Sequence, residues 1–142
     1  MSNGLSNTAY KTRDEAAVGG FRWVLARGPE WERKEFGFWV ILKVSAAKKV
    51  EYHYTTPQPG SNLGVTLTLP TGLIVRGFCH THPKSISTGN FGGDDFDSFK
   101  KVAKLKLDIV FYLLNPQREI RYARDVSDFM AGKSLDWLKV TP

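Results

Sequence analysis

The segment Cys79-His80-Thr81-His82-Pro83 has the residue types and spacing best suited to chemistry. It follows an apolar run, so we expect it where a β-strand ends. Side chains alternate between the two faces of a strand, so the two histidines point to the same side. Neighbouring imidazoles are good metal ligands, and the proline ends the strand because it has no backbone N–H. The segment therefore predicts a metal site.

A third ligand is expected from the acidic start of a helix, Asp94-Asp95-Phe96-Asp97. A carboxylate in the first helical turn can face back toward the histidines. Asp95 is favoured because Asp94 can act as an N-cap instead, and Asp97 is a more distant alternative. Two histidines and one aspartate leave the fourth tetrahedral position for water, which is the arrangement of a catalytic zinc ion.

Such a site needs a carboxylate that takes the proton of the water and returns it to the leaving group. Glu35 is the best candidate, because it precedes the apolar run 36–44 and a small residue, Gly37, stands two positions later. Glu30 and Glu32 lie in a polar stretch. The alternative for Glu35 is an exposed carboxylate next to Lys34.

The elements that must position these residues follow from periodicity and turn signals. Thr12 with Glu15 three positions later is typical of a helix N-terminus, and Gly28-Pro29 ends that helix. Gly19-Gly20 within it weakens the helix or allows close packing on a sheet. The predicted strands are 36–44, 49–55, 65–69, 73–80, 107–114 and 119–124, and the predicted helices are 12–26, 94–104 and 126–138.

This order predicts one α/β domain at residues 12–142, with a mixed, mostly antiparallel sheet flanked by helices. Residues 1–11 are predicted to be a flexible leader, and the segment 56–60 a turn. Cys79 and His80 point to opposite faces of their strand, so they cannot form a thiol–imidazole pair, and we expect Cys79 in the core. His53 is predicted to face solvent, with a place in a substrate groove as the alternative.

Composition narrows the class of protein. The chain has 142 residues with a formal net charge of +6 and one cysteine, which excludes a multi-cysteine zinc finger. No apolar run approaches the roughly 20 residues of a membrane span, and no signal peptide is visible. We expect a cytoplasmic protein, or one secreted without a cleavable signal. The lysines at 100, 101, 104 and 106 are interpreted as a solvated helix face, which does not favour nucleic acid.

The combined pattern resembles the JAMM (JAB/MPN-type) metallopeptidase superfamily. That family has a glutamate on an early strand, then His-x-His-Pro, then Ser-x-x-Asp; the matching residues are Glu35, His80, His82, Pro83 and Asp95. The sequence is most similar to the short JAB-like domains at the C-termini of bacterial polymorphic toxins and Rhs-type effectors. Those domains also share a Tyr-x-Tyr-Thr-x-Pro-x-x-Gly segment, which stands at residues 52–60.

The resemblance implies a cytidine-deaminase-like JAB/MPN fold, Zn²⁺, and hydrolysis of a peptide or isopeptide bond in a protein substrate. It also implies a cognate immunity protein as a partner. The family's serine, which assists the oxyanion, is replaced by Gly92, and the loop is about two residues longer than the family spacing. Ser85 and Ser87, or Thr88, are candidates to replace that serine and contact the substrate.

Two alternatives stay open. The first is a catalytically degenerate JAB-like module that only binds a partner. The second is a metal-dependent nuclease toxin, which a basic surface would suit. A nucleobase deaminase is excluded, because its His-x-Glu and Pro-Cys-x-x-Cys motifs are missing.

Overall fold

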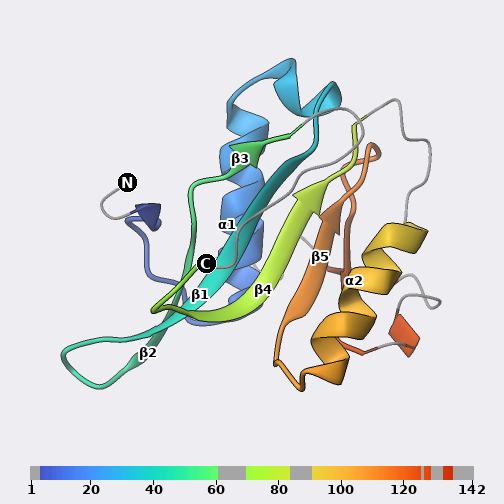
Figure 1. Ribbon diagram of the computed structural model, residues 1–142. Coiled ribbons are helices and arrows are strands. Elements are labelled where there is room, and N and C mark those ends of the chain that lie inside the picture. The colour runs from blue at the N-terminus through green and yellow to red at the C-terminus, as the bar shows by residue number, and fades with distance from the viewer. Residues whose placement is uncertain (1–3, 61–69, 84–90, 126, 129–132, 136–142) are drawn as a thin grey trace.

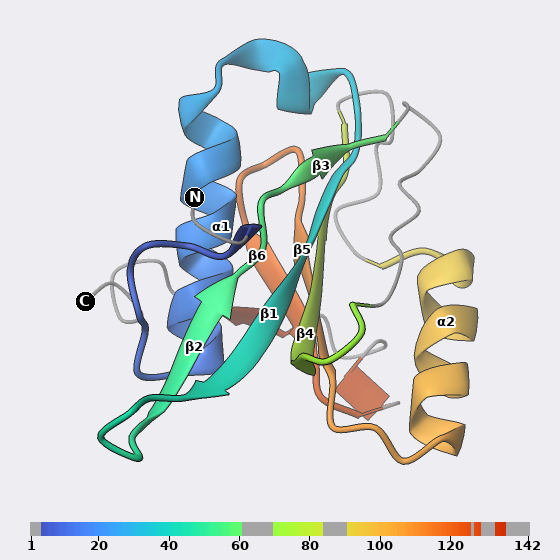
Figure 2. The ribbon, with the colours of Figure 1, turned by 60° about the vertical axis from the view of Figure 1, so that its left-hand side comes forward.

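The described part of the chain forms one mixed sheet with an α-helix on each face. A computed structural model describes residues 4–60, 70–83, 91–125, 127–128 and 133–135, without the side chains of residues 93, 94 and 96. Helix α1 (Arg13–Ala26) covers one face of the sheet and helix α2 (Gly93–Lys104) the other, as Figures 1 and 2 show from two directions. The predicted α/β class is confirmed.

The strand order brings the end of one central strand next to the start of α2. The strands are β1 (Phe36–Val44), β2 (Val50–Tyr54), β3 (Gln58–Pro59), β4 (Ile74–Thr81), β5 (Val110–Leu114), β6 (Ile120–Ala123) and β7 (Ser134–Leu135), and the short 3-10 helix η2 (Pro29–Glu32) follows α1. Their order is β2-β1-β4-β5-β6-β7, with β3 also paired to β1. Only β4 and β5, among these strands, are parallel neighbours. A parallel pair needs a crossover connection, and α2 lies in it.

Helix α1 forms where the sequence predicts it. Thr12 is its N-cap, and the Thr12 hydroxyl accepts a hydrogen bond from the Glu15 backbone N–H at 3.1 Å. The helix buries one face against the sheet, through Ala16, Ala17, Val18, Gly20, Phe21 and Val24. These side chains pack with residues of β1, β4 and β5 in a first core cluster that includes Cys79, which is fully buried as predicted.

A second core cluster lies on the opposite face, under α2. It joins Phe99 of α2 to Ile41, Val75 and Phe111 of the sheet. Phe78 and Phe91 are partly buried and pack against the same cluster. Because His80 and His82 alternate with Cys79 and Thr81 along the chain, they share this face with Phe78.

Of the predicted flexible leader at residues 1–11, the structure describes residues 4–11. Residues 4–10 run beside β2, with backbone bridges from Leu5 to Thr55 and from Tyr10 to Tyr52. The predicted solvent exposure of His53 is wrong, because residues 4–10 cover its side chain. His53 Nδ1 lies 2.9 Å from the Ser6 carbonyl oxygen.

Three further segments depart from the predicted elements or cannot be compared with them. The predicted turn 56–60 contains β3, whose Pro59 pairs with Phe36. The predicted terminal helix 126–138 is wrong at Ser134–Leu135, which form β7 beside β6. The predicted strand 65–69 lies outside the described residues.

Within the described ranges, no helix has both the length and the apolar character needed to cross a membrane.

Candidate metal centre

The candidate centre lies where β4 ends and α2 begins. His80 is the penultimate residue of β4, and His82 follows the last one. The backbone N–H of His82 donates to the carbonyl oxygen of Leu114 at 2.9 Å, so pairing with the neighbouring chain continues past the end of β4. Both imidazoles are therefore held by a regular sheet rather than by a loop. Ligands in open α/β sheets commonly bind beyond the carboxyl ends of strands.

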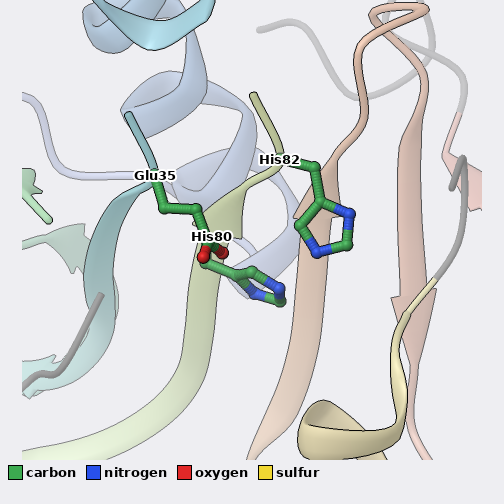
Figure 3. A group of neighbouring side chains, drawn as sticks. All are labelled: Glu35, His80 and His82. Atoms are coloured by element: carbon green, nitrogen blue, oxygen red, sulfur yellow. The ribbon is translucent and has the colours of Figure 1, made fainter. Parts of the chain in front are cut away.

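Glu35 joins the two histidines from the residue just before β1. One ligand atom from each of Glu35, His80 and His82 can be chosen so that all three lie within 4.8 Å of one another. Figure 3 shows the three side chains converging at neighbouring ends of β1 and β4. Their exposed fractions are 6% for Glu35, 2% for His80 and 5% for His82. Glu35 is thus a buried carboxylate, and its neighbour Lys34 pairs with Glu30 instead, at 3.6 Å.

Asp95 reaches the same two imidazoles from the first turn of α2. Its Oδ1 lies 3.1 Å from His80 Nε2, and its Oδ2 lies 3.8 Å from His82 Nε2. The Gly92 backbone N–H donates to Oδ2 at 2.8 Å, which fixes the carboxylate at the helix N-terminus. The structure therefore brings together the four residues that the sequence singles out.

The other candidate residues are placed elsewhere or lie outside the description. Asp97 is exposed and pairs with Lys100 at 3.5 Å, so it does not belong to this cluster. The side chain of Asp94 is not described, and Ser85 and Ser87 lie outside the described residues.

Burial and neighbouring charges shift the pKa values of the cluster in opposite directions. Burial raises the pKa of Glu35, although the two histidines counteract part of that effect. Burial by itself would lower the pKa of His80, but the adjacent Asp95 carboxylate and Glu35 reverse this and raise it. Despite its own burial, the pKa of Asp95 falls well below its usual value because of the histidines. Without a metal ion, Asp95 and His80 therefore each favour the charged form of the other.

The donor set of this cluster fits a zinc ion. Neither ring nitrogen of His80 makes an aligned hydrogen bond within the described part of the chain, although the ring is almost fully buried. Asp95 lies beside Nε2 without an aligned hydrogen bond. Buried polar atoms that lack a well-formed hydrogen bond are costly, and a metal ion satisfies an imidazole nitrogen. Two imidazole nitrogens and a carboxylate oxygen are the ligand types that zinc takes in catalytic sites.

Two ligand sets are compatible with this geometry. In the first, His80, His82 and Asp95 hold the metal and Glu35 is left to carry a proton. In the second, Glu35 is itself the carboxylate ligand. Ligands of a tetrahedral zinc ion lie about 3.3 Å apart, as its bond lengths require. The distances of 3.1 and 3.8 Å from Asp95 to the imidazoles are close to this value.

Sequence reasoning missed two neighbours of the histidines. The Phe78 ring stacks on His80, with 5.5 Å between ring centroids and an interplanar angle of 15°. The sequence could have predicted this contact, because Phe78 and His80 are two residues apart in β4 and therefore lie on the same face of the strand. The second is Thr81, whose hydroxyl accepts a hydrogen bond from the Phe36 backbone N–H at 2.9 Å. That contact joins two strands, so only their register reveals it.

A thiol nucleophile at Cys79 is not supported by its surroundings. The side chain is fully buried in the cluster under α1, on the sheet face away from His80. Burial raises the pKa of the thiol well above its ordinary value, and the nearby Asp14 adds to this effect. A neutral, inaccessible thiol is a poor nucleophile.

A scan against models of known protein families gives no match for this sequence, and a search of curated proteins finds none that matches it either. The geometry of the cluster is therefore the main indication of what this chain does.

Proposed function

We propose that this chain is a zinc-dependent peptidase or isopeptidase of the JAMM type. The observation on which the proposal depends is the buried convergence of Glu35, His80 and His82, with Asp95 against both imidazoles. Buried ionisable groups gathered at a strand end are unfavourable for stability unless they are paired or bind a metal ion. The sheet with a helix on each face supports the further proposal of a JAB/MPN fold.

In this proposal His80, His82 and Asp95 would hold the zinc ion. A bound zinc ion would supply a Lewis acid for the scissile carbonyl group and lower the pKa of a water molecule. Glu35 would accept a proton from the water molecule that attacks the carbonyl carbon, and would return it to the leaving nitrogen as the C–N bond breaks. A carboxylate whose pKa is raised suits this role, because a proton carrier works best when its pKa lies near the operating pH.

The proposed substrate is a peptide or isopeptide bond, on a ubiquitin-like tail or on a protein of a target cell. The similarity to toxin domains suggests the effector of a bacterial secretion system, held inactive by an immunity protein that covers His80 and His82. Such an effector would act in the cytoplasm of the target cell.

The first test of this proposal is the zinc content of the purified protein. We expect about one zinc ion per chain, lost in the double variant His80→Ala, His82→Ala. His53→Ala is the matched control, because His53 is the third histidine of the sequence and lies under the N-terminal segment. It should keep its zinc. Undiminished zinc in the double variant would refute the site.

Glu35→Gln separates the two ligand sets. If Glu35 carries the proton, the variant keeps its zinc while hydrolysis falls by roughly 10²–10⁴-fold, the usual contribution of general acid–base catalysis. If Glu35 is a ligand, zinc is lost together with activity. Asp95→Asn should weaken zinc binding in the first case. Glu30→Gln removes a carboxylate that pairs with Lys34 at the surface, and it should change neither quantity.

One observation favours a catalytically degenerate binding module as the second candidate. Gly92 occupies the position of the serine in the family motif, and it offers the site only a backbone N–H, which Asp95 uses. Zinc binding without cleavage of any peptide or ubiquitin-like substrate would favour this candidate. Restored cleavage in Gly92→Ser would identify the missing hydroxyl as the cause.

A further inference from the structure

Thr81 stands between the two histidines but faces the other side of the strand. Its side chain is completely buried, and its Oγ1 accepts the hydrogen bond from the Phe36 backbone N–H at 2.9 Å. Phe36 directly follows Glu35 in the sequence. A residue of the His-x-His segment is thus bonded to the backbone that carries the proposed proton carrier.

The peptide group between Glu35 and Phe36 is held on both sides. Its carbonyl oxygen accepts a hydrogen bond from the Gly60 backbone N–H at 2.7 Å, and its N–H donates to Thr81. Two opposed hydrogen bonds fix the plane of a peptide group. Because that plane sets the direction in which the Glu35 side chain leaves the backbone, the two bonds also orient the carboxylate.

The strand register explains why a side chain takes this place. Gly37 lies opposite His80 and Phe38 opposite Cys79, so Phe36 falls opposite Thr81. The paired residues of β1 and β4 end at Gly37 and His80. At the next pair of residues, Phe36 and Thr81, the Thr81 hydroxyl accepts the hydrogen bond from the Phe36 backbone N–H.

We propose that Thr81 is a positioning residue, which sets the Glu35 carboxylate relative to His80 and His82. This inference rests on the function proposed above. Thr81 is covalently joined to both histidines, so any movement of β4 carries the imidazoles and the peptide after Glu35 together. Catalytic groups must be held within about 0.5 Å of their productive geometry. Thr81, between His80 and His82, provides this positioning through its hydrogen bond with the Phe36 N–H.

The test uses Thr81→Val, which keeps the shape of the side chain but removes its acceptor. We expect the zinc content and KM to stay near the wild-type values while kcat falls about 10–100-fold, since a misplacement of about 1 Å can cost 10²-fold. Thr81→Ser keeps a hydroxyl and should restore kcat to within a few-fold of wild type. If Thr81→Val does not fold, Thr81→Cys replaces it, and its weak sulfur acceptor should give an intermediate loss.

Thr55→Val is the matched control. The Thr55 hydroxyl accepts a hydrogen bond from the Trp39 backbone N–H at 2.9 Å, so the same threonine-to-valine change removes the acceptor of a β1 N–H group three residues beyond Phe36. Its kcat should equal that of wild type. An equal loss of kcat in both valine variants would show a general effect on β1 and overturn the inference. An unchanged kcat in Thr81→Val would overturn it as well.

Amide exchange of the metal-free protein separates this inference from the proposed function. NMR should show faster exchange at Phe36 in Thr81→Val, with Trp39 unchanged, and the reverse pattern in Thr55→Val. If wild type binds no zinc and cleaves nothing, the proposed function fails. Faster exchange at Phe36 in Thr81→Val would still show that Thr81 fixes the peptide group between Glu35 and Phe36. Equal Phe36 exchange in wild type and Thr81→Val would overturn the positioning by Thr81 whatever the activity.

Discussion

The hydroxyl group of Tyr112 donates a hydrogen bond to Asp14 Oδ1, although one residue lies in β5 and the other in the first turn of α1. Arg124 donates to the second oxygen of the same carboxylate at 2.8 Å. Tyr112 is fully buried, and burial together with Asp14 raises its pKa, so the phenol stays neutral and acts as a donor. These contacts join α1 to the sheet on the face away from the candidate metal centre.

Tyr112→Phe should lower the free energy of unfolding by about 1.5–3 kcal/mol, the range for a hydrogen bond to a charged group. The measurement is urea denaturation. Tyr54→Phe serves as the control, because the described residues offer its hydroxyl no hydrogen bond, and it should change stability little. A Tyr112→Phe variant as stable as wild type would mean that Arg124 alone satisfies Asp14.

At the scale of elements, the contact between α1 and β1 depends on a residue without a side chain. A Cβ atom placed on Gly20 would lie 2.3 Å from Cε2 of the Phe38 ring. That ring is buried and packs edge-on against Phe21, with ring centroids 5.1 Å apart. Gly20 therefore serves close packing of α1 on the sheet, which is one of the two roles that the sequence allows for the glycine pair.

Gly20→Ala should destabilise the protein, although alanine favours a helix by up to about 1 kcal/mol over glycine. Overpacking a core costs about 1–3 kcal/mol, so we expect a net loss in urea denaturation. The double variant Gly20→Ala, Phe38→Leu should recover part of it. Gly19→Ala meets the tip of the Tyr10 side chain instead, at 2.3 Å, and that side chain can move at lower cost. A more stable Gly20→Ala variant would contradict this account.

At the scale of the whole molecule, an ion pair links the first turn of α1 to the residues that precede β5. Arg13 donates to both oxygens of Asp108, at 3.0 and 3.2 Å, and also to the Arg76 carbonyl oxygen at 3.2 Å. The hydrogen bonds from Arg13 lower the pKa of Asp108. Because the Asp108 side chain is largely exposed, we expect its contribution to stability to be small.

The sign of the pH dependence follows from the lowered pKa. Asp108 stabilises the folded protein above its unfolded pKa of about 3.9, and this contribution is lost as the pH falls through the lower folded pKa. Asp108→Asn should therefore unfold at a lower urea concentration than wild type at pH 6, and the difference should shrink at pH 3. Asp97→Asn, in an exposed pair with Lys100, should match wild type at both pH values. A constant Asp108→Asn difference would refute the electrostatic origin.

Sequence by itself determined the local features of this protein. The bounds of α1 follow from Thr12 and the turn signal after Ala26, and β1 follows from an apolar run of β-branched and aromatic residues. The shared face of His80 and His82 follows from the two-residue period of a strand. Each of these depends on neighbours within a few positions, so each can be read along the chain.

Tertiary structure alone decided which distant residues meet. Glu35 is buried beside histidines 45 and more positions away because β1 and β4 pair in one particular register. His53 is covered because residues 4–10 lie along β2 rather than in solvent. The same register places Thr81 against Phe36. A strand's period fixes the face that a side chain takes, but its partner depends on strand order and pairing, which the packing of the whole chain selects.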